Sequence, residues 1–185
     1  MTAAVAERTI YNPVQRDRVT FLEMAADTAG GRTLAELEVA PGGGNMLHRH
    51  LTYAEHFEVL EGVLTVEVDG VVLRLGPGQS AVAPIRSLHR WANESDAPAV
   101  CLIEVVPGHR GFEQTLQIGY GLAADGLTRD DGVPRRPADL AVLAELSDIR
   151  LPPPMALLAP LMTVLARRAR ANGHEQALIE RYVTY

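Results

Sequence analysis

The sequence predicts a mainly β domain, built as a sandwich or a small barrel, followed by a helical extension. Apolar and polar residues alternate through roughly the first hundred positions, which is the pattern of half-buried strands. Glycine, proline and aspartate break this alternation at short intervals, as expected for short strands joined by tight turns. Beyond Pro107-Gly108 the apolar spacing changes to about 3.6 residues, the period of a helix.

The expected strands follow from this alternation and from the turn residues between its segments. In Arg32 to Ala40 one face carries Ala35, Leu37 and Val39 and the other carries Glu36 and Glu38, as in a half-buried strand. Asp69-Gly70 is a two-residue hairpin signal between two apolar runs. The other expected strands are Arg18 to Met24, His56 to Val68, Val71 to Leu75, Ser80 to Pro84, Leu88 to Asn93 and Ala99 to Val106.

Four helices are expected in the rest of the chain. Pro137 can open a helix at its first position, and Pro152-Pro153-Pro154 separates that helix from the next one. Asn172-Gly173 is a C-terminal cap signal. The expected helices are Arg110 to Ala124, Ala138 to Asp148, Met155 to Ala171 and Glu175 to Tyr182.

Length and composition fit one globular domain with an appendage. A chain of 185 residues slightly exceeds one domain, at roughly 150 residues per domain. The apolar fraction of 47% and the charged fraction of 22% are ordinary for a soluble protein with a sizeable core. We therefore expect an N-terminal arm with a first strand (1–30), a β core (31–107) and a helical extension (108–185) that packs on the core or on a partner subunit.

Charge and residue usage exclude several classes of function. A net charge of -6 argues against nucleic-acid binding, which needs a basic face. All 17 basic residues are arginine, so Schiff-base chemistry on lysine and a phosphate-loop lysine are excluded. The single Cys101 cannot form an internal disulfide, and Met1 to Arg8 lacks the apolar run of a secretory signal. A reducing, cytoplasmic compartment is the expectation.

Three histidines and one glutamate form a candidate metal site: His48, His50, Glu55 and His89. Alternate side chains of a strand share a face, so His48 and His50 point the same way. If the segment carrying His89 lies beside them, imidazoles and carboxylate converge in a set that suits Fe, Mn, Ni, Cu or Zn. The alternative is ordinary core histidines and a solvated Glu55. A dication would make an otherwise costly buried carboxylate stabilising.

Glycines and a proline around these residues complete two motifs. Gly42 to Gly62 matches G-x5-H-x-H-x3,4-E-x6-G at every fixed position. Gly78 to Asn93 matches G-x5-P-x-G-x2-H-x3-N except that Arg86 stands at the second glycine. In these motifs the chain resembles the cupin superfamily. The resemblance covers only the middle of the chain, and it implies a double-stranded β-helix, or jelly-roll barrel, as the β core.

The resemblance also implies a range of functions. Cupins with this metal motif include dioxygenases of flavonols and small thiols, oxalate-oxidising enzymes, sugar isomerases and polyketide cyclases. We favour a metal-dependent small-molecule enzyme of the dioxygenase kind, because four protein ligands leave one or two positions open on the metal. Glu55 is the candidate general base. The alternatives are a non-catalytic ligand-binding or sensing barrel and a metal-assisted isomerase or cyclase, since one fold serves many tasks.

Four further residues are candidates for contact with a substrate. Met46, Phe57 and Trp91 share strand parity with the proposed ligands and would project inward, either as pocket wall or as packed core. Arg86 replaces a residue able to adopt positive φ, which puts the geometry of its turn in question. Its side chain can attract a carboxylate or enolate at the pocket mouth, or form a surface ion pair. By the same parity His56 and Glu58 face outward, and His109 and His174 are expected at the surface.

The stretch 155–171 raises the questions of membrane contact and of assembly. Leu151 to Ala166 is too short to span a bilayer, which needs about 20 apolar residues. The larger apolar side chains fall on one side, which favours packing on the barrel or on a second subunit. Peripheral membrane contact through 155–171, next to the basic end Arg167-Arg168-Ala169-Arg170, is the weaker alternative. A homodimer is expected, binding a small-molecule ligand.

Overall fold

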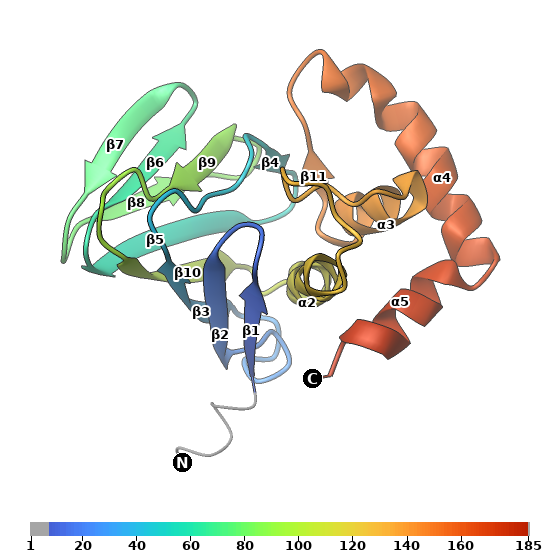
Figure 1. Ribbon diagram of the computed structural model, residues 1–185, viewed down its shortest axis with the longest axis horizontal. Coiled ribbons are helices and arrows are strands. Elements are labelled where there is room, and N and C mark those ends of the chain that lie inside the picture. Colours follow the sequence, from blue (N-terminus) through green and yellow to red (C-terminus); the bar gives the residue numbers. More distant parts are fainter. Residues whose placement is uncertain (1–7, 185) are drawn as a thin grey trace.

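The structure, a computed structural model, describes residues 8–184 and has a β half and a helical half (Figure 1). Within the β half, strand pairing is antiparallel throughout the described residues. The strands are β1 (Thr9–Asn12), β2 (Asp17–Glu23), β3 (Thr33–Val39), β4 (Arg49–His50), β5 (Ala54–Glu61), β6 (Leu64–Val68), β7 (Val71–Leu75), β8 (Ser80–Ala83), β9 (His89–Ala92) and β10 (Ala99–Val106).

Two sheets enclose the main core. The larger has the order β1-β2-β3-β10-β5-β8, and the smaller has the order β7-β6-β9. Alternate residues of β5 and β10 are buried, because successive side chains of a strand point to opposite faces. The core between the sheets includes Leu37, Val39, Phe57, Val59, Leu64, Val66, Cys101 and Val105. This arrangement confirms the predicted jelly-roll class, with helices at its C-terminal end.

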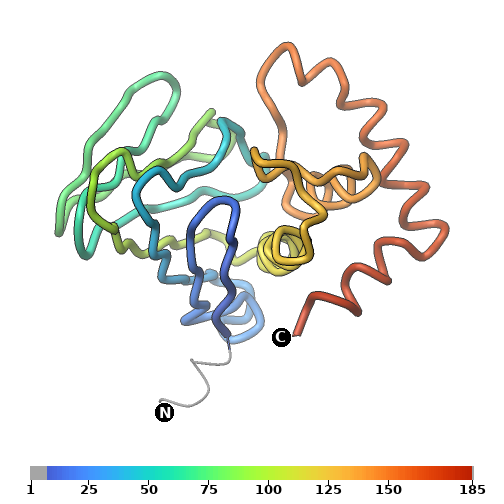
Figure 2. The backbone as a smooth tube through the Cα atoms, viewed as in Figure 1, coloured from blue at the N-terminus to red at the C-terminus, as the bar shows by residue number. Residues whose placement is uncertain are grey.

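The helical half has a smaller core of its own. Its elements are α2 (Arg110–Ala124), α3 (Pro137–Leu146), β11 (Ile149–Arg150), η1 (Met155–Leu158), α4 (Ala159–Ala171) and α5 (His174–Tyr182). In the backbone trace the chain leaves the β half through α2, passes outward to α4 and returns toward α2 with α5 (Figure 2). Its core consists of Ile118, Leu122, Val142, Leu143, Ala169 and Leu178.

Helix α2 joins the two halves through buried polar contacts. Near its start, Oε1 of Glu113 accepts hydrogen bonds of 2.6 Å from the amide of Ala25 and from the hydroxyl of Thr33. Toward its end, the hydroxyl of Tyr120 donates a hydrogen bond of 2.5 Å to Oδ2 of Asp17. Both carboxylates are buried, so α2 is anchored on the β half rather than loosely attached to it.

Most expected elements are confirmed, and the differences have local causes. The run expected as one strand, His56 to Val68, is two strands because Gly62 turns the chain at φ 73°. A Cβ at Gly62 would lie 2.4 Å from the carbonyl oxygen of Pro98, so only glycine fits. The helix expected to reach Asp148 ends at Leu146, and Asp148 itself adopts φ 54°. The helix expected over Met155 to Ala171 begins with the 3-10 turn η1.

The N-terminal part agrees with the expected arm and first strand only in outline. Two strands, β1 and β2, lie within 1–30 and pair with each other. The residues 1–7, to which the expectation about a secretory signal refers, lie outside the described residues. Strand β11 has no counterpart among the expected elements, because two residues carry no periodic pattern.

The large apolar side chains of 155–171 were expected to pack on the barrel or on a second subunit, and in the single chain they do not pack on the barrel. Helix α4 buries its small residues, Ala166 and Ala169, against the rest of the helical half. The large apolar side chains are exposed, with Leu157 at 81%. No helix among residues 8–184 is long and apolar enough to cross a membrane. The exposed apolar face comprises Met155, Leu157, Leu158, Leu161 and Val164.

Candidate metal centre

The four predicted ligands come together where the two sheets meet. His50 lies on β4, Glu55 on β5 and His89 on β9, and His48 forms an isolated bridge with His89 through reciprocal backbone hydrogen bonds of 3.0 and 2.8 Å. All four side chains are buried, and His48 is the most exposed of them at 6%. One ligand atom from each residue lies within 4.8 Å of the other three. The sequence prediction that these residues converge is thus matched by their placement.

The interatomic distances define a compact centre. Nε2 of His48 lies 3.0 Å from Nε2 of His50. Nε2 of His50 lies 3.1 Å from Oε1 of Glu55, and Nε2 of His89 lies 3.6 Å from Oε2. The last distance is beyond a normal hydrogen bond, and the buried Nε2 of His89 has no hydrogen-bond partner among residues 8–184. An orphaned buried nitrogen beside two imidazoles and a carboxylate is what a cation-binding site would contain.

All three imidazoles are oriented by backbone carbonyls. Nδ1 of His48 lies 2.7 Å from the carbonyl oxygen of Met46, and Nδ1 of His89 lies 3.1 Å from that of Ser87. Nδ1 of His50 lies 3.0 Å from the carbonyl oxygen of Ser147. A carbonyl oxygen only accepts, so each Nδ1 carries the hydrogen. When such a ring is neutral, its Nε2 presents a lone pair to the centre, as the ligands of a metal do.

This arrangement is unfavourable without a positive charge between the rings. The lone pairs of His48 and His50 face each other at 3.0 Å, and neither nitrogen has a hydrogen to share while both rings are neutral. A proton or a metal ion between them would turn this repulsion into attraction. The donor set of three imidazoles and one carboxylate suits a divalent transition metal, and the cluster can hold one such ion.

The electrostatics of the centre reflect burial and mutual proximity. Burial, followed by the neighbouring His50 and His89, lowers the pKa of His48 to about 4. Burial alone would raise the pKa of Glu55, but His50 and His89 hold that pKa well below its usual range. Burial acts to lower the pKa of His89, but the carboxylate of Glu55 outweighs it and the pKa is raised. The carboxylate is thus ionised at neutral pH and ready to bind a cation.

Strand parity assigned the neighbours of Glu55 correctly. Phe57 and Val59 are fully buried in the core between the sheets, whereas the side chains of His56 and Glu58 face outward. His56 contacts Glu104 on the outer face, at 3.5 Å from Nδ1 to Oε2. The outward direction of His56 separates it from the cluster despite its place next to Glu55 in the sequence.

The four candidate substrate contacts occupy different environments. Phe57 packs within the apolar core, and Trp91 is buried at 6% exposure with its backbone amide bonded to Asn45. Met46 is 41% exposed, and its carbonyl oxygen is the partner of His48. Arg86 is exposed, and no carboxylate among the described residues lies within ion-pair distance of it. The expectation that Arg86 forms a surface ion pair is therefore not met.

The turn at Arg86 keeps the conformation that glycine would favour. Arg86 adopts φ 72°, a left-handed conformation that is uncommon for residues other than glycine. Its amide donates a hydrogen bond of 2.7 Å to the carbonyl oxygen of His50. The substitution therefore leaves the turn connected to β4, and the Arg86 residue is exposed.

Sequence reasoning missed residues of the helical half that contact the centre. The hydroxyl of Tyr53 donates a hydrogen bond of 2.9 Å to the carbonyl oxygen of Ser147, and the Tyr53 ring stacks on His50 at 4.2 Å. Oδ2 of Asp148 accepts a hydrogen bond of 3.1 Å from the amide of Leu51. A backbone carbonyl has no sequence signature, so only Tyr53, which lies within the first motif, could have indicated this contact.

The two histidines expected at the surface have structural partners instead. Nδ1 of His109 accepts the amide hydrogen of Phe112 at 3.0 Å and so caps α2, and its ring lies 4.7 Å from that of Tyr53. Nε2 of His174 lies 2.6 Å from Oδ1 of the buried Asp139. Both side chains are partly buried, because His109 caps the start of α2 and His174 connects α5 to α3.

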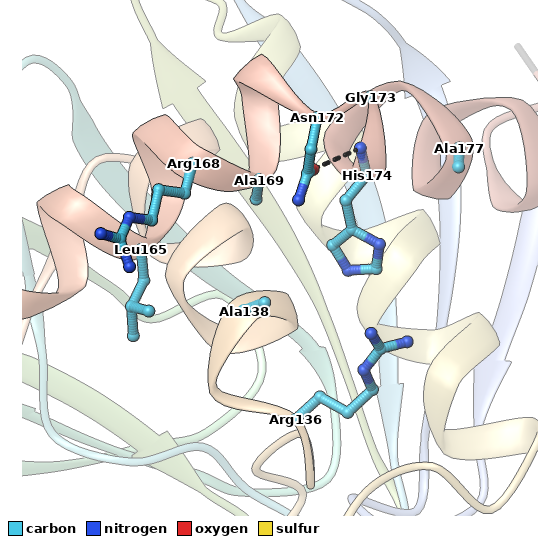
Figure 3. Close-up of a pocket in the computed structure, with 9 residues that line it drawn as sticks. All are labelled: Arg136, Ala138, Leu165, Arg168, Ala169, Asn172, Gly173, His174 and Ala177. Atoms are coloured by element: carbon cyan, nitrogen blue, oxygen red, sulfur yellow. Dashed lines mark hydrogen bonds between the residues drawn. The ribbon is translucent and has the colours of Figure 1, made fainter.

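A cleft in the helical half is separate from the four-residue cluster. It has a volume of about 500 Å³ and lies between α3, α4 and α5. Figure 3 shows Arg136 and His174 pointing toward each other across it, with Arg168 on the far side. None of its lining residues belongs to the metal-ligand candidates.

Comparison with known proteins assigns the β half to a family. The cupin domain family model matches residues 35–106. Residues 35–106 therefore form a cupin domain, as the two motifs predicted. The match includes all four residues of the cluster, and it ends before the helical half begins.

Individual proteins resemble parts of this chain. Alginate biosynthesis protein AlgA of Pseudomonas aeruginosa is 33% identical over 104 residues, which make up 55% of this chain and 21% of that protein. The chain spans about a fifth of the length of the curated relatives it matches. A crystal structure of a RmlC-like cupin from Shewanella frigidimarina is 20% identical, covers 57% of this chain and 90% of its own, and has a TM-score of 0.49.

A further structural likeness is of the same order. The structure described as a sugar phosphate isomerase from the cupin superfamily of Silicibacter pomeroyi is 21% identical and has a TM-score of 0.47. The likeness covers 53% of this chain and 69% of that one.

Proposed function

We propose that this protein is a metal-dependent enzyme of the small-molecule dioxygenase kind, with one divalent transition metal held by His48, His50, Glu55 and His89. The proposal is carried by the three Nε2 atoms and one carboxylate that converge at a buried point while every Nδ1 is held by a carbonyl. Fe, Mn, Ni, Cu and Zn all suit this donor set.

The proposed chemistry needs a metal site and a base, and residues of this chain are proposed for both. A metal in this site would supply Lewis acidity and open coordination positions for a small oxygen-containing substrate. Glu55 is the proposed base. Its Oε2 is the less tightly held oxygen, at 3.6 Å from His89 against 3.1 Å between Oε1 and His50, so Oε2 is the atom that takes the proton.

Four residues near the candidate ligands in the sequence are proposed as substrate contacts. The guanidinium of Arg86 is exposed and has no ion-pair partner in the described part of the chain, which supports a role in attracting a carboxylate or enolate. Met46 is partly exposed next to His48, and the buried indole of Trp91 lies on the same strand as His89. We propose that these two side chains and Phe57 give the site its apolar character.

A metal-assisted isomerase or cyclase that needs no oxygen is the second candidate. It is favoured by the 104-residue similarity to a protein of alginate biosynthesis, which points toward a carbohydrate ligand. The same four residues would hold the metal, and Glu55 would move a proton between neighbouring carbons.

Oxygen consumption separates the two candidates. Metal-loaded protein is screened with dicarbonyls, phenols, small thiols and sugars in an oxygen electrode, with product analysis of each reaction. Oxygen uptake that is lost in Glu55→Gln supports the dioxygenase proposal. Conversion of a sugar without oxygen uptake supports the isomerase instead, and binding without turnover of any compound would contradict both and leave a ligand-sensing barrel.

We also propose a cytoplasmic homodimer. The exposed apolar face of η1 and α4 contains no charged side chain, and a two-fold axis would set this face against itself in a second copy. The buried free thiol of Cys101 is consistent with a reducing compartment. Light scattering should give a dimer mass that falls to the monomer mass in Leu157→Glu/Leu161→Glu. A monomeric wild type that floats with liposomes would contradict the dimer and support peripheral membrane contact.

A further inference from the structure

The three histidines of the centre differ in what holds them. His48 and His89 bond to the carbonyl oxygen of the residue two positions earlier, so their own segments of the β half orient them. His50 bonds to the carbonyl oxygen of Ser147, which lies 97 residues further along the chain. Ser147 lies beyond the residues that the cupin family model matches. The orientation of this one ligand is therefore supplied by the helical half.

We propose that the segment from Ser147 to Arg150 is a working part of the metal centre, which positions His50 for ligation and couples the helical half to metal affinity. The inference rests on the proposed metal site. It assigns a function to the C-terminal extension that the β half alone does not provide.

Several hydrogen bonds hold Ser147 in place between α3 and the metal centre. Its carbonyl oxygen accepts from both Nδ1 of His50 and the hydroxyl of Tyr53, which uses both lone pairs. Ser147 is 1% exposed, and its own hydroxyl donates a hydrogen bond of 2.8 Å to the carbonyl oxygen of Leu143 in α3. The position of this carbonyl is therefore fixed from the side of the helix as well as from the side of the histidine.

The residues that follow Ser147 fasten the segment to β4. Ile149 pairs with His50 and Arg150 pairs with Arg49 in a short antiparallel ladder. Asp148 turns the chain at φ 54° and accepts the amide hydrogen of Leu51. Figure 1 shows β11 and β4 side by side at the junction of the two halves. Such a turn in a non-glycine residue is uncommon, and it brings both α3 and β11 onto the strand of the ligand.

The physical effect is to select one tautomer and one ring orientation. A carbonyl acceptor at Nδ1 keeps the hydrogen there and directs the lone pair of Nε2 toward the centre. Loss of such a partner of a metal-bound histidine typically costs about 10–100-fold in metal affinity. Any change that displaces the end of α3 should therefore loosen His50 while leaving His48 and His89 in place.

Two alanine substitutions in α2 test this inference, one that causes a steric clash next to Ser147 and one that causes none. A Cβ added at Gly111 in α2 would lie 1.8 Å from the carbonyl oxygen of Leu146 and 2.8 Å from its carbonyl carbon, so the backbone before Ser147 must shift. The same addition at Gly119 in the same helix meets only Leu143 Cδ1 at 3.9 Å, an ordinary contact. Gly111→Ala and Gly119→Ala are thus the same chemical change in one helix with different steric results.

The first readout needs no metal. Nitrogen-15 NMR of histidine-labelled, metal-free protein at pH 8 reports the tautomer of each ring. We expect His50 to lose its single Nδ1-H form in Gly111→Ala, while His48 and His89 keep theirs and show that the β half is intact. Gly119→Ala should match the wild type for all three rings.

The second readout is the affinity for Co²⁺, measured by competition with a chelator. We expect a fall of about 10–100-fold in Gly111→Ala and no change in Gly119→Ala. Tyr53→Phe, which keeps the stacked ring and removes only the hydroxyl, is the milder variant should Gly111→Ala fail to fold. Its matched control is Tyr182→Phe, which removes a hydroxyl bond to Asp125 in the helical half.

The outcomes separate this inference from the proposed function. If Gly111→Ala, or Tyr53→Phe in its place, keeps the His50 tautomer and binds Co²⁺ within about twofold of its control, the positioning role is overturned even in a working enzyme. The wild type itself could bind no Co²⁺ while the tautomer of His50 still depends on its contact with Ser147. In that case the proposed metal function fails, and the structural coupling between the helical half and His50 stands.

Discussion

Two buried carboxylates in different regions of the molecule show how their neighbours decide the charge of a buried group. Asp17, at the start of β2, accepts a side-chain hydrogen bond from Tyr120, and its Oδ1 has no hydrogen-bond partner within the described part of the chain. Burial raises the pKa of Asp17 to about 6. Glu55 is equally buried, but His50 and His89 hold its pKa well below the usual range.

The difference teaches that the two sites are built for different occupants. The side chain that bonds to Asp17, Tyr120, is neutral, so protonation is the favourable way to neutralise the buried carboxylate. The hydrogen bond between Asp17 and Tyr120 fastens α2 to the β half. Glu55 lies against imidazoles whose ligand atoms converge with its own carboxylate, so one bound cation would satisfy all four groups at once. Changes to each carboxylate should therefore have different consequences.

The largest expected effect is that of Glu55→Gln on metal binding. An amide keeps the shape but removes the charge that offsets a dication in a buried site, which is worth about 3–5 kcal/mol for a buried charge pair. We expect the Kd for Co²⁺ or Zn²⁺ to rise on the order of 1000-fold. Isothermal titration of wild type, Glu55→Gln and Asp17→Asn measures it. An equal loss in Asp17→Asn would remove the distinction between the two carboxylates.

The second effect is a pH dependence of stability that belongs to Asp17. Its folded pKa of about 6 exceeds the ordinary value of 3.8, so the folded state binds this proton more tightly than the unfolded chain does. The contribution of Asp17 is therefore complete below pH 3.8 and is lost as the pH rises through about 6, with a total of about 3 kcal/mol.

Urea unfolding of wild type and Asp17→Asn from pH 4 to 7 isolates this term, because asparagine does not titrate. The free energy of unfolding of the wild type, relative to the variant, should fall as the pH rises. A difference that is constant across this range would show that Asp17 is ionised throughout and that its hydrogen bond to Tyr120 compensates for burial.

A smaller effect is expected for Tyr120→Phe. The hydroxyl of Tyr120 is the donor to Asp17, and leaving a buried acceptor unpaired costs about 1–3 kcal/mol. The loss should be greater at pH 7, where Asp17 is ionised, than at pH 4. The exposed Tyr11 offers the control, since Tyr11→Phe should change stability by less than about 0.5 kcal/mol at either pH. Equal losses of stability in Tyr120→Phe and Tyr11→Phe would show that the buried hydrogen bond does not stabilise the fold.

The candidate site could be predicted from the sequence because its signals are local. His48 and His50 share a face at a spacing of two residues, and the motifs around Glu55 and His89 fix which strands carry them. The partner of His50 could not be predicted, because it is a backbone carbonyl 97 residues away. The groups that orient the ligands can therefore be identified from the fold but not from residue type.

The fold shows the same division between local and distant information. The bounds of α2 and β10 agree with the expectation because periodicity and turn residues define them. The apolar side of 155–171 was expected to pack on the barrel or on a second subunit. Within the single chain, α4 packs through its alanines and exposes Leu157 and Leu161. Periodicity shows that a helix has an apolar face, but it does not show which partner covers that face.

Metal analysis tests the central claim most directly. Protein purified without a histidine tag is loaded with Fe²⁺, Mn²⁺ or Zn²⁺, dialysed and analysed by mass spectrometry, beside the double variant His48→Ala/His50→Ala and the control His56→Ala, whose side chain faces outward. We predict about one metal ion per chain in the wild type and the control, and almost none in the double variant. Full metal content in the double variant, or none in the wild type after loading, would contradict the assignment of this centre.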